Sequence, residues 1–270
     1  MPDEPIPDAS ADGSAIASGP ACALVVGVAN RRSIAWAISQ RLAASGVRLV
    51  LTYADERLGE NVRELAATLD RPIVLPCDVT SERQVGDVYA AIGRECGRLD
   101  YLVHAVAFAP RTELSGRFVD TTREGFRVAL DVSVYSLIAL TRGALPLMRQ
   151  AGGGSVLTLS YLGARRVFPN YNVMGVAKAG LEAAVRYLAA DVGRDNVRVN
   201  ALSAGPIRTL AAAGISGFSE ILQVYRDRSA LKRNIDASEI AETACYLLTA
   251  APGLTGETVT VDAGYNIMGM

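Results

Sequence analysis

The sequence predicts a single α/β domain of the doubly wound Rossmann type, with a seven-stranded parallel sheet and helices on both faces. Short runs rich in valine, leucine and isoleucine alternate with longer helical patterns, which is the order expected of such a sheet. A glycine-containing loop follows the first run, as in folds that bind a dinucleotide at the carboxyl ends of their strands. A length of 270 residues suits one domain of this kind, and we find no internal repeat.

Composition argues against several other classes of protein. A formal net charge of −1 provides no basic field for nucleic acid or a membrane surface. The apolar runs are interrupted well before the roughly 18 residues of a membrane-spanning helix, so we expect no membrane segment. Four scattered cysteines without a CxxC pair, and a single histidine, argue against a metal site and suit a reducing cytoplasm.

The first 20 residues differ in composition from the rest of the chain. They carry four acidic residues and four prolines but no lysine or arginine. A signal peptide would begin with positive charge, and a transit peptide would be rich in arginine. We therefore predict a disordered acidic tail over residues 1–20 and a dinucleotide-binding catalytic domain over 21–270.

The first strand is expected over 23–27, and the helix after it ends at Gly46. Gly27 allows a tight turn and a close approach of a phosphate group. Ser33 begins the helix, where free amides and the helix dipole attract a pyrophosphate. The loop lacks the GxGxxG fingerprint, and a glycine between a strand and a helix can also be only a turn.

The second strand, 47–53, is followed by Asp55. A carboxylate at this point can accept a hydrogen bond from an adenosine ribose and repels a 2′-phosphate, which favours NADH over NADPH. Asp55 could equally be the N-cap of a helix over 57–68. The third strand, 73–75, leads to Asp78, which could reach an adenine edge, cap the following helix, or do both.

The fourth strand is expected over 99–106. Its last residues, AVAFAP, are small and apolar, which suits a backbone that lies against a flat ring. We interpret His104, within this strand, as a packed structural histidine. A long helix is then expected over 123–150, with Pro146 kinking it or nearly ending it.

The chemistry is expected in the segment 155–178, which passes from a strand through an aromatic loop into a helix over 172–193. Tyr171 and Lys178 are seven residues apart, about two helical turns, so both side chains can share one face. A phenol near a fixed ammonium can polarise a carbonyl and stabilise the oxyanion formed on reduction. Such a pair usually means nothing in an arbitrary helix. This pair, however, follows a strand of an alternating α/β chain, and ligands in such sheets bind at the carboxyl ends of the strands, so its position favours a function.

The strand 197–202 is followed by SAGPIRTLAAAGISGFSEIL. The proline fixes the backbone, and Thr209 is placed to hydrogen-bond an amide or a phosphate of the cofactor. Residues 210–222 are largely small and apolar and are broken by glycine, which predicts a mobile substrate lid within residues 208–225. An ordinary buried helix is the alternative for this segment. A helix over 237–249 and a strand over 258–261 complete the fold.

Five blocks of sequence resemble those of a known family: GVANRRSIAWAI, CDV, SYLGARRVFPNYNVMGVAKAGLEA, VRVNALSAGPIRTLA and VDAGY. Over roughly residues 20–267 the chain resembles the bacterial NADH-dependent enoyl-[acyl-carrier-protein] reductases, a divergent branch of the short-chain dehydrogenases. Ordinary short-chain dehydrogenases place the tyrosine four residues before the lysine. Met174 holds that place here, and the spacing of seven between Tyr171 and Lys178 is that of the enoyl reductases.

This resemblance implies a reaction and its partners. Hydride from NADH would pass to Cβ of a trans-2-enoyl thioester on acyl carrier protein, the last reductive step of type II fatty-acid elongation. Tyr171 would hold the resulting enolate oxygen, and Lys178 would bind the nicotinamide ribose. Protonation at Cα would complete the saturated thioester. The family is tetrameric, so a homotetramer is expected.

The resemblance also implies site residues. Tyr171 and Lys178 would be catalytic, with Tyr161 in a supporting role. The cofactor-binding residues would be Gly27, Ser33, Ile34, Asp55, Asp78, Val79, Ala107, Lys178, Pro206, Ile207 and Thr209. The substrate-binding residues would be Phe108, Ala109, Tyr161, Met174, Ala211, Ile215 and Phe218.

One departure from the family concerns how the acidic carrier protein docks. Some members carry basic residues along the lid, where this chain has Ser216, Ser219 and Glu220. Docking would then be weak or would use other charges, such as Arg226, Arg228 and Lys232.

Three other functions would require different features of the sequence or share those of the enoyl reductase. A ketoreductase or alcohol dehydrogenase of the same fold would have tyrosine in place of Met174. A non-enzymatic dinucleotide sensor would need no Tyr–Lys pair. An enoyl reductase of a secondary-metabolite pathway would keep every catalytic residue, so the sequence leaves that alternative open.

Overall fold

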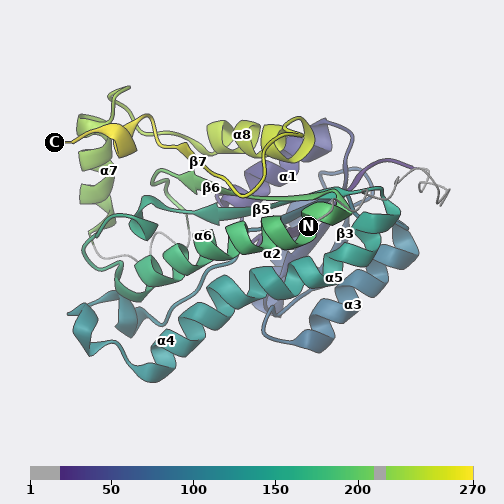
Figure 1. Cartoon of the computed structure of the whole chain (residues 1–270), viewed down its shortest axis with the longest axis horizontal. Helices are drawn as coiled ribbons and strands as arrows, with labels where there is room; N and C mark the ends of the chain where they lie inside the picture. Colours follow the sequence, from purple (N-terminus) through teal and green to yellow (C-terminus); the bar gives the residue numbers. More distant parts are fainter. Residues whose placement is uncertain (1–18, 210–216, 270) are drawn as a thin grey trace, which may run out of the picture.

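The computed structural model describes residues 19–209 and 217–269, and in these ranges strands and helices alternate as the sequence predicts (Figure 1). The strands are β1 (Cys22–Val26), β2 (Arg48–Tyr53), β3 (Ile73–Pro76), β4 (Tyr101–His104), β5 (Gly154–Ser160), β6 (Val197–Ala204) and β7 (Thr258–Val261). The helices are α1 (Ile34–Ala44), α2 (Glu56–Ala66), α3 (Glu82–Glu95), α4 (Arg123–Leu130), α5 (Ser136–Gln150), α6 (Asn172–Val192), α7 (Phe218–Arg228) and α8 (Ala237–Thr249).

The seven strands form one sheet in the order β3-β2-β1-β4-β5-β6-β7, and every neighbouring pair is parallel. The predicted fold is confirmed. The order changes direction at β1, which pairs with β2 on one side and β4 on the other. In sheets of this kind the loops diverge at that point, and ligands bind in the crevice at the carboxyl ends of the strands.

Two layers of helices cover the two faces of the sheet (Figure 1). Helices α1 and α8 pack together on one face, in a core that includes Trp36, Ile38 and Leu247. Helices α3, α5 and α6 cover the other face, in a core that includes Ile92 and Leu140. Because the central strand β1 is buried along its whole length, its sequence is a continuous apolar run rather than an alternating one.

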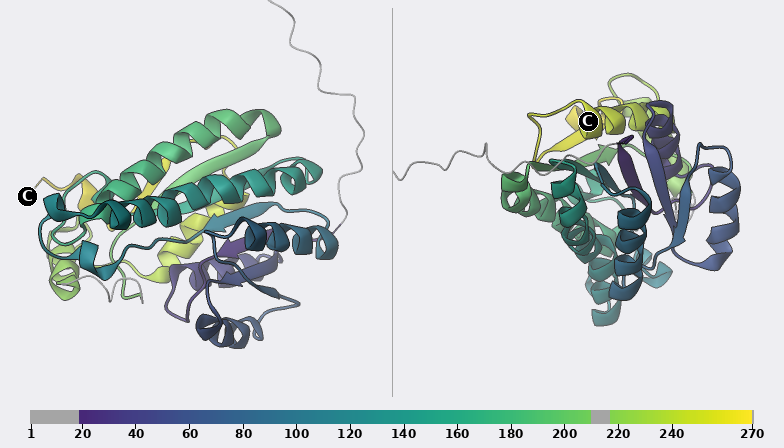
Figure 2. Two further views of the ribbon diagram at one scale, coloured as in Figure 1. Left: turned by 90° about the horizontal axis from the view of Figure 1, so that it is seen from below. Right: turned by 90° about the vertical axis from the view of Figure 1, so that its right-hand side faces the viewer.

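Two long helices, α5 and α6, run together, and the end of the chain packs against α7. Figure 2 shows α5 and α6 side by side, and these helices are also in contact. The C-terminal segment lies beside α7, where the ring of Tyr265 stacks on Tyr225 with 3.7 Å between the centroids. The predicted lid therefore ends in a helix that packs against the C-terminal segment.

The segment predicted as one helix over 123–150 is continuous, but it is not regular. A π-helical turn, Asp131–Tyr135, joins α4 to α5, and Pro146 lies inside α5 without ending it. The helix ends four residues after Pro146, at Gln150, where the sequence predicted its end. The irregularity occurs where Ser133 and Ser136 turn toward strand β4: the Phe108 amide donates to Ser133 Oγ (3.0 Å), and Ser136 Oγ bonds His104 Nε2 (2.8 Å).

The same run, Arg123–Gln150, is long and apolar enough to cross a membrane, judged by length and composition alone. One such helix is weak evidence of a membrane span, because the core helix of a soluble protein meets the same criteria. The apolar composition has another explanation in the structure. Leu137, Leu140 and Met148 are fully buried in the core against the sheet, as expected of a core helix.

One strand, β4, is clearly shorter than the sequence predicts. It does not span 99–106, because Ala105 is the last residue whose amide bonds β1 (to Val26 O, 2.9 Å) before the chain leaves the sheet. The tail predicted over 1–20 lies almost wholly outside the described residues, as do residues 210–216 of the predicted lid.

Candidate functional site

A cavity of about 1060 Å³ lies at the carboxyl ends of the strands, where the loops after β1 to β6 meet. Every described residue that the sequence assigned to the site lines it: Gly27, Ser33, Ile34, Asp55, Asp78, Val79, Ala107, Phe108, Ala109, Tyr161, Tyr171, Met174, Lys178, Pro206, Ile207, Thr209 and Phe218. Ala211 and Ile215 lie outside the described residues. One fold thus brings together positions that are up to 191 residues apart, from Gly27 to Phe218 (218 − 27).

Gly27, at the end of β1, is required by its surroundings. Its φ is +103°, and a Cβ there would lie 2.3 Å from the carbonyl oxygen of Ala105. Any other residue would therefore push the β1 loop away from the chain leaving β4. The absence of a side chain at Gly27 therefore allows the β1 loop to pack closely against the chain that leaves β4, beneath the cavity.

The N-terminus of α1 is open toward the cavity. Ser33 stands at the N-cap position, but its hydroxyl donates to Asn30 O (2.7 Å) and does not cap the helix. Helices α2, α3, α4 and α8 are each capped by a side chain: Asp55, Ser81, Thr122 and Asp236, respectively. The first amides of an α-helix have no intrahelical acceptor, so the end of α1 can receive an anion.

Asp55 has the capping role that the sequence left open. Its carboxylate accepts a hydrogen bond from the Leu58 amide (3.1 Å) at the start of α2, and it also lines the cavity. Capping engages one carboxylate oxygen, so the second remains able to accept from a ligand. Arg57 lies 3.8 Å from that second oxygen, and its side chain is largely exposed.

Asp78 does not cap α3, and that part of the prediction is wrong. The N-cap is Ser81, whose hydroxyl accepts from the Gln84 amide (3.3 Å). Asp78 lies three residues too early to reach those amides, and its carboxylate accepts instead from the backbone amide and hydroxyl of Thr80. Asp78 therefore stabilises the turn at the cavity wall.

Tyr171 and Lys178 are both buried at the start of α6, with 9% and 6% of their surfaces exposed. Tyr171 occupies the N-cap position, and Lys178 follows two turns later. Lys178 Nζ donates to the carbonyl oxygen of Leu159 on β5 (2.7 Å), which fixes the ammonium beside the sheet. Burial lowers the pKa of Lys178 to about 8, although the nearby carboxylate of Glu182 acts in the opposite direction.

The phenol of Tyr171 is held neutral. Burial, with a smaller contribution from Tyr161, raises the pKa of Tyr171 well above its usual value. Its ring has room because Gly163 faces it, and a Cβ there would lie 2.5 Å from Tyr171 Cδ1. Its hydroxyl makes no hydrogen bond to the residues that the structure describes, and the residue faces the cavity. Tyr171 is thus a free donor in an apolar wall.

An aromatic cluster positions Tyr161. Its ring meets Tyr171 edge-on, with 5.1 Å between centroids, and lies 5.0 Å from Phe168. Its hydroxyl accepts a hydrogen bond from Tyr225 on α7 (3.3 Å), and Tyr225 in turn stacks on Tyr265. Sequence analysis did not identify Tyr225 or Tyr265 as site residues, because a single aromatic in a helix and another near the chain end have no distinctive spacing.

His104 is structural, as interpreted. The ring is fully buried, with Nδ1 at 2.8 Å from Thr158 Oγ1 and Nε2 at 2.8 Å from Ser136 Oγ. Burial lowers the pKa of His104 to about 3, so the ring is neutral at physiological pH. Among the residues of 19–209 and 217–269, no three His, Cys, Asp or Glu side chains come together as a metal site.

The doubly wound sheet, the open end of α1 and the buried tyrosine–lysine pair define a dinucleotide-dependent oxidoreductase of the short-chain dehydrogenase type. A family model described as enoyl-(acyl carrier protein) reductase matches residues 27–266. The chain belongs to the enoyl-[acyl-carrier-protein] reductase family, which confirms the resemblance noted in the sequence.

Similar proteins carry that name over nearly their whole length. The enoyl-[acyl-carrier-protein] reductase [NADH] FabI of Bacillus subtilis is 49% identical over 247 residues, which is 90% of this chain and 95% of the relative. The protein of the same name from Nostoc is 49% identical over 252 residues, with 92% and 97% covered.

Two solved structures are similar in fold and sequence. The Bacillus cereus enoyl-acyl carrier protein reductase with NADP+ and indole naphthyridinone has a TM-score of 0.90 and 49% identity, covering 93% of this chain and 98% of that one. The reductase of Anaplasma phagocytophilum in complex with NAD has a TM-score of 0.89 and 46% identity, covering 93% and 95%.

Proposed function

We propose that the protein reduces the trans-2 double bond of enoyl thioesters carried by acyl carrier protein, with NADH as the reductant. This is the last reductive step of type II fatty-acid elongation. The observation that carries the proposal is the placement of Tyr171 at the cavity wall seven residues before Lys178, with Met174 in the position of the ordinary dehydrogenase tyrosine. The names of relatives 49% identical over nine-tenths of the chain support it.

The residues around the cavity fit NADH. The open end of α1 can receive the pyrophosphate. Gly27 keeps the loop after β1 close to the sheet, which leaves room for the pyrophosphate in the cavity. The free oxygen of Asp55 can accept from the adenosine ribose and would repel a 2′-phosphate. Lys178 can bind the nicotinamide ribose hydroxyls, because only one of its three donors is engaged by Leu159. NADH, when bound, supplies the hydride.

The chain's own groups act on the substrate oxygen. Reduction at Cβ moves negative charge onto the thioester oxygen, as an enolate. Tyr171 remains protonated at any physiological pH because burial raises its pKa above the usual value of a phenol, so its hydroxyl can donate to that oxygen. The ammonium of Lys178, fixed on β5, adds positive potential beneath the site. Cα is then protonated to give the saturated thioester.

The acyl chain would lie against the apolar side of the cavity. Ala109 and Met174 are buried there, and Phe108 and Phe218 line the same space from the β4 loop and α7. An apolar wall excludes water from the enolate, which strengthens each hydrogen bond made to it. Tyr161 supports this wall by holding the ring of Tyr171 edge-on.

We also infer that the protein is a cytoplasmic homotetramer. Exposed aromatic side chains on α4, the π-helical turn and α6 support this inference: Phe126, Tyr135 and Tyr187. Large exposed apolar groups on long helices are typical of subunit interfaces. Light scattering on the purified protein would test it, and a monomeric mass would contradict the inference.

The reaction can be tested by following NADH absorbance with a trans-2-enoyl thioester, and then repeating the assay with NADPH. We expect NADH oxidation that depends on the enoyl substrate. Oxidation of NADPH alone would keep the reaction and contradict the role of Asp55. Folded protein that binds NADH but oxidises neither cofactor would contradict the proposed function.

A further inference from the structure

A second cavity, of about 530 Å³, lies beside the first. It is bounded by the loop that precedes α1, the segment after β6, helix α7 and the segment that leads into α8. Pro206 and Ile207 line both cavities, so the second lies directly against the wall of the first. None of the assigned cofactor or substrate roles uses the rest of its lining.

Its lining is strongly positive. Four arginines contribute to it, Arg31, Arg32, Arg208 and Arg226, against the single carboxylate of Asp236. Within residues 19–209 and 217–269, the side chains of the first three arginines make no ion pair or hydrogen bond. Arg226 contacts Asp227 at 3.4 Å, and both of these side chains are more than half exposed.

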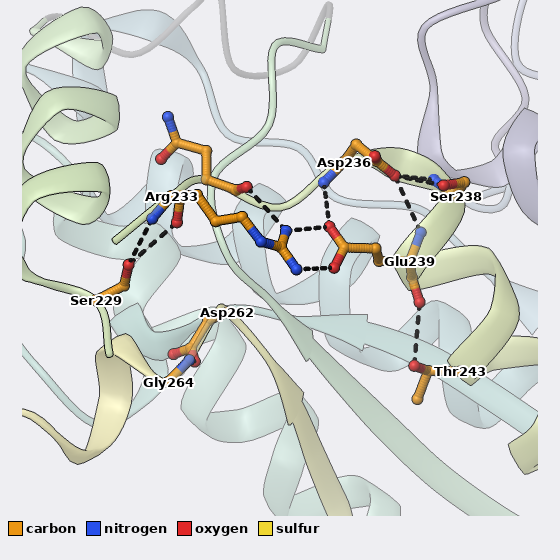
Figure 3. A network of polar contacts seen from close by, with 9 residues as sticks. Ser229, Arg233, Asp236, Ser238, Glu239, Thr243, Asp262 and Gly264 are labelled. Atoms are coloured by element: carbon orange, nitrogen blue, oxygen red, sulfur yellow. Dashed lines mark hydrogen bonds and ion pairs between the residues drawn. The ribbon is translucent and has the colours of Figure 1, made fainter. Parts of the chain in front are cut away.

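The one carboxylate in the lining is already engaged (Figure 3). Asp236 caps α8 by accepting from the amides of Ser238 (2.8 Å) and Glu239 (3.1 Å). Glu239 is paired with Arg233 at 2.7 Å, and Ser229 holds the backbone of Arg233 in place. Since this network uses the nearby carboxylates of Asp236 and Glu239, three of the four arginines face the cavity unpaired among the described residues, and Arg226 has only its exposed contacts with Asp227 and Gln223 there.

Helix α7 explains why the charge lies where it does. Ser219 and Arg226 both line the second cavity, and seven residues, about two turns, separate them on one helix face. The position of Ser219 is one where some family members carry a basic residue on the lid. The positive charge of this chain therefore lies further along the same face and is joined by three arginines from other segments.

We propose that these four arginines, here termed the arginine groove, dock the acidic surface of the acyl carrier protein. This inference rests on the proposed function. Charge complementarity steers an acidic partner to such a surface, and a shared wall with the substrate cavity places the carrier where its prosthetic arm can deliver the acyl chain. Arg228 and Lys232, which the sequence also offered, do not line the groove.

The test uses the full chain and one enoyl group on three supports. These are the carrier protein, 4′-phosphopantetheine, and N-acetylcysteamine, which has no charge. The double variant R31Q/R226Q is compared with R228Q, on the same helix but outside the groove, and with R94Q on α3. NADH affinity is measured for each variant by fluorescence titration.

We expect the double variant to raise KM for the carrier-linked substrate by about tenfold with kcat nearly unchanged, and to flatten its dependence on salt. Its KM for the N-acetylcysteamine thioester should stay within about twofold of the wild type. R228Q and R94Q should behave as the wild type. Binding of the carrier protein without an acyl group, measured by fluorescence anisotropy, should weaken in parallel.

Three results would overturn the proposal. An unchanged KM for the carrier-linked substrate would remove the groove from docking. Equal losses with the phosphopantetheine thioester would mean that the arginines bind the phosphate of the arm and not the protein. Equal losses with all three substrates would place the effect on NADH or on the fold. Failure of the wild type with every thioester would instead contradict the proposed function itself.

Discussion

Two buried polar clusters lie next to each other in this protein, and they are built differently. One surrounds His104 on β4, and the other contains Tyr171 and Lys178 at the start of α6. Both are largely removed from solvent, and in both burial shifts the pKa strongly, down to about 3 for His104 and well above its usual value for Tyr171. Burial and a shifted pKa therefore do not distinguish structure from function here.

The hydrogen bonds do distinguish them. Both ring nitrogens of His104 are engaged, by Thr158 and Ser136. Among the described residues the Tyr171 hydroxyl has no partner, and Lys178 uses one donor of three. Buried polar groups are normally satisfied, so unused capacity beside a large cavity indicates a ligand. The satisfied cluster stabilises the sheet, and the unsatisfied one is available for chemistry.

The largest expected effect is that of Tyr171→Phe. The ring packing stays, and only the free donor is lost. We expect turnover to fall by roughly 100- to 1000-fold, as for the loss of an oxyanion donor, with NADH binding nearly intact. Steady-state kinetics and fluorescence titration measure the two quantities. Tyr246→Phe, on the exposed side of α8, is the matched control and should have no effect.

Wild-type turnover in Tyr171→Phe would remove the hydroxyl from the mechanism. A large loss of NADH affinity would mean that the hydroxyl serves the cofactor and not the enolate.

Lys178→Ala should act on the cofactor. Losing a charged donor to the ribose is expected to weaken NADH binding by about tenfold or more. In the wild type, affinity should fall as pH rises through about 8 and above, because Lys178 is protonated below its pKa and neutral above it. Bound phosphates would move this midpoint upward. The variant should lose the pH dependence, and an unchanged affinity would contradict the ribose contact.

His104→Gln addresses the satisfied cluster and should leave turnover within about threefold of the wild type. Its signature is in stability. The pKa of His104 is about 3 when folded and near 6.5 when unfolded, so the unfolded chain binds the extra proton between these values. Stability supplied by the neutral ring is thus present above about pH 6.5 and is lost as pH falls toward 3.

Denaturant unfolding at pH 7 and pH 4 measures that effect. We expect the wild type to lose up to about 3 kcal/mol more than His104→Gln on acidification, since each pH unit in this window is worth about 1.4 kcal/mol. Equal losses would mean that the folded protein does not hold the His104 ring neutral as the pH falls.

The sequence predicted the fold well, because the central strands are buried on both faces and read as unbroken apolar runs. The π-helical turn at Asp131–Tyr135 could not be predicted, since Ser133 and Ser136 there are hydrogen-bonded to the loop after β4 and to β4 itself. The same dependence on distant partners explains the apolar composition of α5, which resembles a membrane span until its packing is seen.

The site was predictable where it depends on backbone and spacing. Gly27 and the start of α1 follow from one strand–turn–helix unit, and Tyr171 with Lys178 from one helix. The cap of α3 was misassigned because Asp78 and Ser81 are both good capping residues, and only the position of the helix start decides between them. The arginine groove could not be predicted, since its arginines come from three separate segments, and Arg31 and Arg32 lie more than 170 residues before Arg208 and Arg226.

The smallest expected effect is that of Tyr225→Phe. The Tyr225 hydroxyl is hydrogen-bonded, as the His104 ring is, but its partner is a residue of the candidate site. The substitution removes the hydrogen bond to the Tyr161 hydroxyl, which is long at 3.3 Å, and keeps the stack on Tyr265. We expect turnover to fall by only about two- to threefold, at the low end for a lost neutral hydrogen bond. Tyr225→Leu, which also loses the stack, should cost more in thermal stability than Tyr225→Phe. A loss as large as that of Tyr171→Phe would instead mean that the Tyr161 hydroxyl, oriented from α7, is itself the group that donates to the enolate.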